Sequence, residues 1–318
     1  MAGKTIAITD CDHPSVDIEK RILMEEDFHV QTFQCKTEEE VIQNCRDADG
    51  IIVQYAPLTE KVLTALPACK VIANYGVGVD NIDVETATGL GIQVCNVPDY
   101  GYEEVSDHAL AMLLNLVRKL TMLNNQTKNN IWDFQIARPI KRLKAQTLGV
   151  VGLGGIGLTL AKKAQALGIN VIGYSRSSKH DLGFETVSFD YLIKHSDIVS
   201  IHLPLNDDTY HLFNRNVFSE MQQHAILINT ARGAIVDEMD LVDALKHNQI
   251  GGAGIDVLEK EPGEKNHPLY QCNNAIITPH SAWYSEETIV ELKEKVAKEA
   301  RAFLLGKDIK YPVNVIKK

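Results

Sequence analysis

Over the first hundred residues, short runs of β-branched and other apolar residues alternate with segments whose apolar residues recur at helical spacing. The runs predict strands, because branched side chains suit a pleated and half-buried backbone. Thr37 and Glu40, after the second run, have the spacing of a capping box, which predicts that a helix begins there. This alternation predicts a parallel sheet covered by helices. The predicted strands are residues 5–9, 29–34, 50–54, 71–75 and 93–97.

A second series of the same kind follows a long helical pattern over residues 103–124 and a polar segment. It contains enough strands for a doubly wound sheet of six or more. An amphipathic helix over residues 286–305 comes after this series and is free to pack on the first domain. The predicted strands are residues 147–151, 170–174, 198–203, 225–229, 252–257 and 275–278.

The predicted fold is α/β, with two Rossmann-like domains that each hold a doubly wound parallel sheet. A length of 318 residues exceeds the size at which one core usually stops growing, which favours two domains. We expect a discontinuous N-terminal domain, flavodoxin-like, made of residues 1–100 plus 286–318. Residues 101–285 are expected to form a Rossmann domain that binds a dinucleotide.

Composition narrows the function classes. A net charge of −10 without a large basic cluster argues against nucleic-acid binding, and no apolar run reaches membrane-spanning length. The first residues form an apolar alternation typical of a strand and not of a signal peptide, so we expect a cytoplasmic protein. The six cysteines are scattered without a C-x-x-C pair, so neither a disulfide framework nor a metal site is expected.

A glycine pattern at the start of the second series points to a dinucleotide. Gly152, Gly154 and Gly157 form G-x-G-x-x-G directly after the predicted strand 147–151, with Gly155 and Ile156 between them. Such glycines permit a tight turn and the close approach of a pyrophosphate, which the free N–H groups of the helix start can bind. A glycine-rich turn that binds nothing is the alternative, but the complete strand–turn–helix context favours binding.

Three loops carry candidate catalytic residues. Arg232, Glu261 and His280 each follow a predicted strand of the second series. In an open parallel sheet, ligands bind beyond the carboxyl ends of the strands, so these three side chains are expected to meet at one edge. Taken singly, each has a simpler explanation as a surface or turn residue.

At these positions the sequence resembles the D-isomer-specific 2-hydroxyacid dehydrogenases. The resemblance rests on motifs whose order and spacing agree over nearly the whole chain. Among this family it looks closest to bacterial relatives of the C-terminal-binding-protein corepressors, because HSAWYSEE at residues 280–287 carries their tryptophan. The motifs are YGVGVDNID at 75–83, VGLGGIG at 151–157, NTARGAIVDE at 229–238, DVLEKEP at 256–262 and TPHSAW at 278–283.

The resemblance implies a role for each catalytic candidate, and general chemistry supports it. Arg232 would bind the substrate carboxylate through its forked guanidinium. His280 would be the acid and base, since imidazole exchanges protons near neutral pH. Glu261 would hold the imidazole, and its charge would favour the protonated form.

The resemblance also implies residues that bind ligands. Tyr75, Val77 and Gly78 would contact the substrate, with the N–H groups of Val77 and Gly78 on its carboxylate. Trp283 would line the pocket and favour a side chain longer than that of glyoxylate or pyruvate, although a core or interface role is an alternative. Cofactor contacts are expected from Leu203, Pro204, Thr209, Thr230, Ala231 and Asp256.

One position departs from the dinucleotide pattern. NAD-specific folds place an Asp or Glu about 20 residues beyond the glycine loop, where this chain has Ser175. Arg176, followed by Ser177, Ser178 and Lys179, offers groups that suit a 2′-phosphate. We therefore expect NAD(H) or NADP(H) with a lean to NADP(H), while serine can also contact a ribose and Arg176 can point to solvent or stack on adenine.

The sequence thus predicts an oxidoreductase that transfers a hydride between a nicotinamide cofactor and a small 2-keto or 2-hydroxy acid. We expect a homodimer formed through residues 103–124 and 131–140, where Trp132 and Phe134 are costly to expose. The alternative is a regulatory, corepressor-like protein that senses NAD(H).

Overall fold

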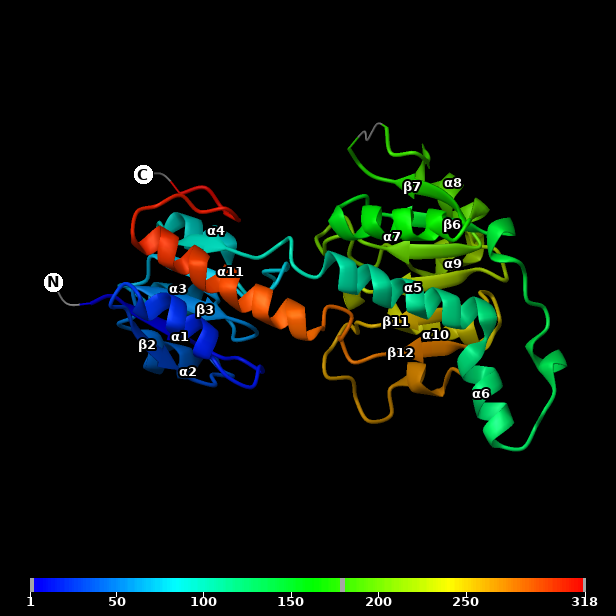
Figure 1. The fold of residues 1–318 in the computed structure, drawn as a ribbon, viewed down its shortest axis with the longest axis horizontal. Helices are drawn as coiled ribbons and strands as arrows, with labels where there is room; N and C mark the ends of the chain where they lie inside the picture. Colours follow the sequence, from blue (N-terminus) through cyan, green and yellow to red (C-terminus); the bar gives the residue numbers. More distant parts are fainter. Residues whose placement is uncertain (1–2, 178–180, 317–318) are drawn as a thin grey trace. The chain divides into compact units, whose positions relative to one another are not determined.

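The computed structural model describes residues 3–177 and 181–316, and these divide into two compact units. The first contains Met1–Tyr100 and Ser285–Lys318, and the second contains Gly101–Tyr284 (Figure 1). Each unit has its own parallel sheet with helices on it. The predicted α/β class with two parallel sheets is confirmed.

The first unit contains a five-stranded sheet in the order β2-β1-β3-β4-β5, which is the flavodoxin-like order. Its buried strands are almost wholly apolar, as expected where both faces of a parallel sheet are covered. The strands are β1 (Thr5–Ile8), β2 (His29–Thr32), β3 (Gly50–Val53), β4 (Val71–Asn74) and β5 (Gln93–Cys95).

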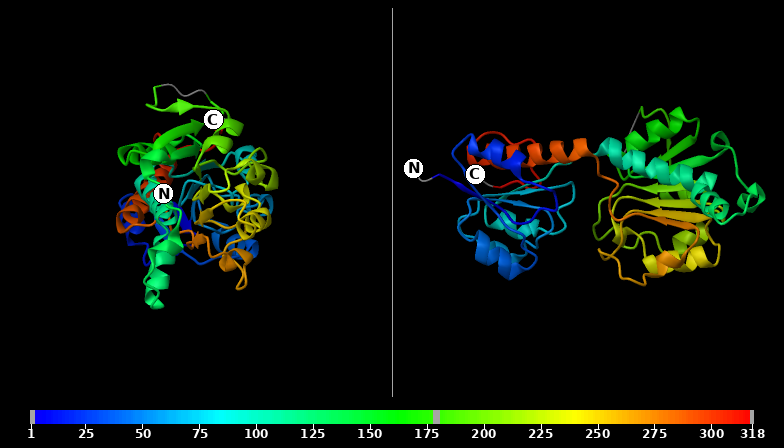
Figure 2. Two further views of the ribbon diagram at one scale, coloured as in Figure 1. Left: turned by 90° about the vertical axis from the view of Figure 1, so that its right-hand side faces the viewer. Right: turned by 60° about the horizontal axis from the view of Figure 1, so that its bottom comes forward.

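Helix α11 (Glu286–Leu304) returns from the far end of the sequence to pack on β3 and β4 beside α1 (Figure 2). Its buried face includes Leu292, Val296, Ala300 and Leu304, which recur at helical spacing. The capping box predicted at Thr37 and Glu40 is present at the start of α2. The helices that precede α11 here are α1 (Asp17–Met24), α2 (Glu38–Cys45), α3 (Glu60–Thr64) and α4 (Val84–Gly89).

The second unit contains a seven-stranded parallel sheet in the order β12-β11-β10-β9-β6-β7-β8. Six of these strands follow the Rossmann order, in which the order of the strands reverses between β6 and β9. The strands are β6 (Thr147–Val151), β7 (Asn170–Tyr174), β8 (Glu185–Thr186), β9 (Ile198–Ile201), β10 (Ile226–Asn229), β11 (Gly252–Ile255) and β12 (Ala275–Ile277).

The helices of this unit cover both faces of the sheet (Figure 1). The α-helices are α5 (Tyr102–Arg118), α6 (Leu120–Lys128), α7 (Gly155–Ala166), α8 (Phe189–His195), α9 (Arg215–Glu220) and α10 (Glu238–Lys246). The 3-10 helices are η1 (Phe134–Ala137), η2 (Leu143–Ala145), η3 (Gly233–Ile235) and η4 (Pro268–Gln271).

Predicted boundaries were wrong in one helix and in several strands. The single helix expected over residues 103–124 is two helices, because Lys119 adopts a left-handed backbone with φ of 54° between α5 and α6. Several strands also end one or two residues earlier than predicted, as β11 does at Ile255. The predicted strands were too long because the first loop residues after the paired part of the strand are still buried.

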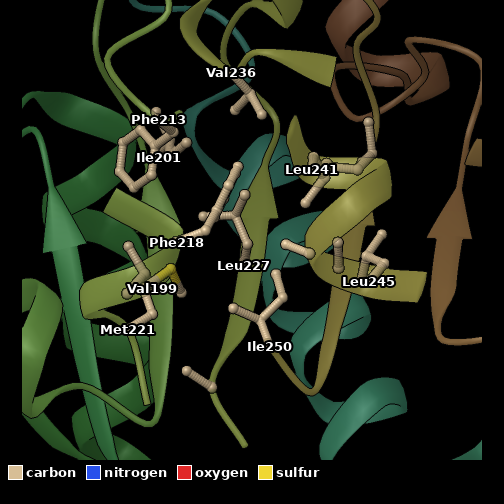
Figure 3. Packing of buried hydrophobic residues seen from close by; sticks show 14 of the residues in the cluster. Val199, Ile201, Phe213, Phe218, Met221, Leu227, Val236, Leu241, Leu245 and Ile250 are labelled. Atoms are coloured by element: carbon tan, nitrogen blue, oxygen red, sulfur yellow. The ribbon is translucent and has the colours of Figure 1, made fainter. Parts of the chain in front are cut away.

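The largest core cluster lies on the face of the second sheet covered by α9 and α10 (Figure 3). Phe213 and Phe218 are fully buried beside Val199 and Leu227, which belong to adjacent strands. This packing fixes the sheet from which the loops of the candidate site extend.

Replacing Phe218 by alanine removes a fully buried ring from this cluster. We expect Phe218→Ala to lower the free energy of unfolding by about 3–5 kcal/mol, measured by urea denaturation. Met239→Ala is the control, because Met239 is exposed on α10, and its change is expected within about 0.5 kcal/mol. Equal effects of the two substitutions would contradict the assignment of this cluster as the core.

Candidate active site

The candidate site lies at the carboxyl edge of the second sheet. Strands β10, β11 and β12 are parallel neighbours, so the loops that follow them leave the sheet at the same edge. These loops carry Arg232, Glu261 and His280 in that order. The topology thus brings together residues that are up to 48 positions apart in the chain.

Glu261 and His280 form a direct pair. His280 Nδ1 lies 2.6 Å from Glu261 Oε2, and the N–H of Leu258 donates to Glu261 Oε1 at 2.8 Å. A carboxylate only accepts, so the proton of this bond belongs to His280 Nδ1, and Nε2 is the nitrogen left for a substrate. The His280 and Glu261 side chains are 40% and 33% exposed, so the pair is accessible.

The pKa of Glu261 lies below its ordinary value of 4.5. Partial burial acts to raise it, but the hydrogen bond and charge of His280, the N–H of Leu258 and the charge of Arg232 together outweigh burial. Glu261 therefore remains a carboxylate at neutral pH. The effect of Arg232 also indicates that its guanidinium lies near the pair.

The turn that carries His280 is held from several sides. His280 has a left-handed backbone with φ of 51°, which is uncommon for a residue with a side chain. Its N–H donates to the carbonyl of Asp256 at 2.8 Å, and its own carbonyl accepts a hydrogen bond from Trp283 Nε1 at 2.9 Å. Such strain persists only where the surroundings determine the conformation.

The Asp256 carboxylate is fully buried and binds the same turn. It accepts hydrogen bonds from the Thr278 hydroxyl at 2.5 Å and from the N–H groups of Ser281 and Ala282, each at 2.9 Å. This side chain thus has a task that the sequence did not indicate. Its expected contact with the cofactor stays a prediction.

The loop that carries Arg232 is shaped by two neighbours. Asn229 at the end of β10 accepts the N–H of Ala231 and donates to the carbonyl of Arg232. A Cβ at Gly233 would lie 2.0 Å from the carbonyl carbon of Leu258, so only glycine lets this loop lie against the loop of Glu261. Arg232 Nη1 donates to the carbonyl of Ala231 at 2.8 Å.

The glycine loop between β6 and α7 has the form that a pyrophosphate requires. Gly152 has φ of 103° and lies against the carbonyl of His202, and Gly157 lies against the carbonyl of Gly152. A Cβ at Gly154, in contrast, would meet nothing within 4 Å. Among the described residues no side chain caps the start of α7, so its first N–H groups are left for a bound group and fit a dinucleotide. Gly155, where a Cβ would strike the ring of Tyr102, permits packing of α5 instead.

The loop after β9 borders the glycine loop. Burial lowers the pKa of His202 to about 4, so this histidine is neutral, and Leu203 and Pro204 follow it. The hydroxyl of Thr209 donates to the carbonyl of Pro204 at 2.7 Å and closes the loop on itself. The hydroxyl of Thr230 is buried and has no hydrogen-bond partner among the described residues, so it is available to a bound group.

The Arg176 guanidinium is engaged by an acid that the sequence did not single out. Its Nη1 lies 2.8 Å from the carboxylate of Asp208, and the two side chains are 62% and 76% exposed. The hydroxyls of Ser175 and Ser177 lie 3.4 Å apart. Ser178 and Lys179 lie outside the described residues. Asp208 is 32 positions from Arg176, and no local pattern links the two.

In the first unit, the carbonyl groups of the loop after β4 accept hydrogen bonds from within the unit. The carbonyls of Gly76, Val77 and Gly78 accept hydrogen bonds from Val97, Asn96 and Asn74, respectively. Within the part of the chain that the structure describes, the N–H groups of Val77 and Gly78 have no partner. Two adjacent free N–H groups suit an anion.

Tyr75, at the start of this loop, is buried and does not point to solvent. Its hydroxyl donates to Glu19 Oε1 at 2.7 Å, and Glu19 lies 3.7 Å from Lys293 Nζ. Its side chain therefore anchors the loop to α1 and α11. Glu19 and Lys293 were missed by the sequence analysis, because nothing in their local pattern separates them from surface charges.

The described residues contain no group of three or more His, Cys, Asp or Glu side chains arranged to hold a metal ion. In the same part of the chain, no helix is both long and apolar enough to cross a membrane.

Comparison with known proteins gives the family. Residues 110–282 match the model of the D-isomer specific 2-hydroxyacid dehydrogenase, NAD binding domain. A glyoxylate reductase of Thermococcus litoralis is 37% identical over 289 residues, which cover 87% of this chain and 86% of the relative. The chain belongs to the D-isomer specific 2-hydroxyacid dehydrogenase family and is an oxidoreductase that transfers a hydride between a nicotinamide cofactor and a small 2-keto or 2-hydroxy acid.

Solved structures agree with this assignment. The D-lactate dehydrogenase from Aquifex aeolicus, complexed with NAD and lactic acid, is 30% identical with a TM-score of 0.87, covering 95% of this chain and 96% of that one. The NADPH-dependent glyoxylate/hydroxypyruvate reductase from Sinorhizobium meliloti, in complex with citrate, is 29% identical with a TM-score of 0.86, covering 99% and 100%. The predicted family and reaction class are confirmed.

Replacing Glu261 by glutamine removes the charge beside His280 and keeps the side-chain shape. Because the pKa of Glu261 is lowered, its side chain carries a negative charge beside His280 at neutral and alkaline pH, and a nearby negative charge stabilises a cation. We expect Glu261→Gln to move the alkaline limb of the reductive kcat/KM profile to lower pH. Glu264→Gln, which alters an exposed glutamate three positions away, is the control. An alkaline limb at the same pH in Glu261→Gln and wild type would rule out the electrostatic role.

Proposed function

We propose that this chain interconverts a small 2-keto acid and its D-2-hydroxy acid, with Arg232, Glu261 and His280 as the residues that bind and protonate the substrate. The observation that carries this proposal is the 2.6 Å pair of Glu261 and His280 at the sheet edge that also carries Arg232. An acid, its orienting carboxylate and a fixed cation are what reduction of a keto acid requires.

Each residue has a separate chemical task. Arg232 is always charged, so it can bind the substrate carboxylate through two parallel hydrogen bonds. His280, oriented by Glu261 through Nδ1, gives the proton on Nε2 to the substrate carbonyl oxygen during reduction and takes it back during oxidation. When bound, the nicotinamide cofactor supplies the hydride in reduction and accepts it in oxidation.

The first unit is proposed to contribute the loop after β4. The free N–H groups of Val77 and Gly78 suit a carboxylate. The carbonyl oxygens of the same loop, which would repel a carboxylate, accept hydrogen bonds from other residues. The buried contact of Tyr75 with Glu19 holds this arrangement.

The substrate is proposed to be a keto acid of a few carbon atoms. The relatives named above act on glyoxylate, hydroxypyruvate or lactate by their names, and Trp283 in this chain would favour a longer side chain. The ring of Trp283 is fixed through Nε1 by the carbonyl of His280, so it lies beside the proposed acid.

A regulatory role is not favoured, because the named relatives are enzymes and the three catalytic candidates are intact. Closeness to the C-terminal-binding-protein corepressors stays a prediction, as does the cytoplasmic location.

Replacing His280 by alanine tests the proposed acid. We expect His280→Ala to lower kcat for reduction by about 10²–10⁴-fold, while the dissociation constant of the reduced cofactor changes less than about twofold. The substrates are glyoxylate, pyruvate, hydroxypyruvate and a longer 2-keto acid. His247→Ala, at an exposed histidine after α10, should behave as wild type. Near-normal turnover of His280→Ala, or no turnover of any keto acid by the wild type, would refute the proposal.

For the cofactor, we propose that NADP(H) is accepted at least as well as NAD(H). Ser175 stands where an acid would repel a 2′-phosphate, and Arg176 follows it. The ion pair of Arg176 with Asp208 is exposed, and such pairs contribute about 0–1 kcal/mol, so a phosphate can displace Asp208.

Comparing kcat/KM for NADPH and NADH with one keto acid tests this preference. We expect Arg176→Ala to lower the value for NADPH more than that for NADH. Arg215→Ala is the control, because Arg215 is similarly exposed and also pairs with aspartates in this unit. A wild-type preference for NADH of tenfold or more, about 1.4 kcal/mol, would show the proposal to be wrong.

We also propose a homodimer formed through the second unit. Trp132 and Phe134 are 91% and 70% exposed, and Leu120, Ile131 and Ile136 are exposed nearby in sequence. Apolar side chains gathered on one segment are typical of an interface between protein chains.

Sedimentation at micromolar concentration is expected to give twice the mass of the 35.3 kDa chain. We expect Trp132→Asp combined with Phe134→Asp to give a monomer, because two buried carboxylates would oppose association. Met239→Asp alters an exposed apolar residue elsewhere in the unit and should remain dimeric. A monomeric wild type would disprove the dimer.

A further inference from the structure

Helix α5 packs on strand β11, and Gly254 of that strand permits their close approach. A Cβ at Gly254 would lie 3.0 Å from Met112, which is a crowded contact, whereas a Cβ at Gly252 would lie at an ordinary 3.4 Å from Leu116. Two residues of a strand span about 6.6 Å and four residues of a helix span about 6 Å. Strand residues two positions apart in β11 therefore face helix residues four positions apart in α5. The next helical turn, at His108, therefore reaches Asp256 just after the end of β11.

His108 contacts the residues that hold the turn of His280. Its Nε2 lies 3.0 Å from the hydroxyl of Thr278 and 3.7 Å from Oδ1 of Asp256. The His108 side chain is 25% exposed and the Asp256 side chain is fully buried.

The direction of each hydrogen bond follows from what the groups can donate. The Asp256 carboxylate accepts, so the single proton of the Thr278 hydroxyl is given to Asp256. Thr278 must then accept from His108, which requires a proton on His108 Nε2. The bonds form one chain from α5 to a buried negative charge, and hydrogen bonds in such a chain strengthen one another.

Asp256 connects this chain to His280. Its carboxylate accepts the N–H groups of Ser281 and Ala282, and its carbonyl accepts the N–H of His280. We propose that His108 is a positioning residue, which fixes the turn of His280 through Thr278 and Asp256. This inference rests on the proposed function only for its expected effect on kcat.

Trp283 reports on the turn without any need for activity. Its Nε1 donates to the carbonyl of His280, and the chain contains only one other tryptophan, Trp132. In a Trp132→Phe background, the fluorescence of Trp283 therefore reflects the conformation of the turn. We expect His108→Leu to shift the emission of Trp283, and His108→Gln, whose amide can still donate to Thr278, to restore it.

The same variants are tested in turnover. We expect His108→Leu to lower kcat for reduction of a keto acid by about tenfold with KM nearly unchanged, since the carboxylate site is intact and only the proton donor is displaced. His108→Gln should recover most of this loss. His195→Leu is the control, because the ring of His195 contacts only Tyr191 of its own helix among the contacts described, through its carbonyl and its stacked ring.

A double-mutant cycle tests the chain itself. Thr278→Val removes the middle link, so His108→Leu should add almost nothing to its effect on kcat, whereas independent sites would give multiplied losses. If His108→Leu does not fold, His108→Asn replaces it, because this side chain stays polar but ends short of Thr278.

The outcomes separate this inference from the proposed function. Altered Trp283 emission with reduced kcat supports the inference, and altered emission with unchanged kcat supports it while rejecting His280 as the acid. Unchanged emission in His108→Leu, or additive losses in the double mutant, would overturn it.

Discussion

The buried carboxylate of Asp256 is the interaction on which the candidate active site depends. A charge without solvent must be compensated by hydrogen bonds, and here the donors come from the turn after β12. The hydrogen bonds to Asp256 therefore hold residues 278–282 in one conformation, which includes the left-handed backbone of His280. The strain at His280 persists because this neighbouring charge requires the turn.

The two carboxylates of the site differ in their exposure to solvent and in what they position. The inner charge of Asp256 is enclosed and positions the backbone, whereas the outer charge of Glu261 is accessible and contacts the imidazole directly. Its lowered pKa and the nearby guanidinium of Arg232 give the edge one fixed anion, one fixed cation and one exchangeable proton. We propose that a keto acid meets this set of charges on reduction.

Much of this arrangement could be predicted from the sequence, because it depends on local or periodic patterns. The capping box at Thr37, the glycine loop and the strands that precede Arg232, Glu261 and His280 all show in short segments. The left-handed break at Lys119 carries no glycine signal, so one helix was expected where there are two.

Contacts between residues far apart in the sequence could not be predicted in this way. The bonds from Asp256 to the turn of His280, the pair of Arg176 with Asp208, and the contact of Tyr75 with Glu19 depend on tertiary packing. The contact of His108 with Thr278 depends in addition on the close approach of α5 to β11 that Gly254 permits.

Single-turnover reduction of a keto acid by cofactor deuterated at the transferred position, in H₂O and in D₂O, tests the central claim most directly. If hydride transfer is coupled to protonation of the substrate oxygen by His280, both the deuterated cofactor and D₂O will slow the reaction. A reaction that the deuterated cofactor slows but D₂O does not would contradict His280 as the proton donor.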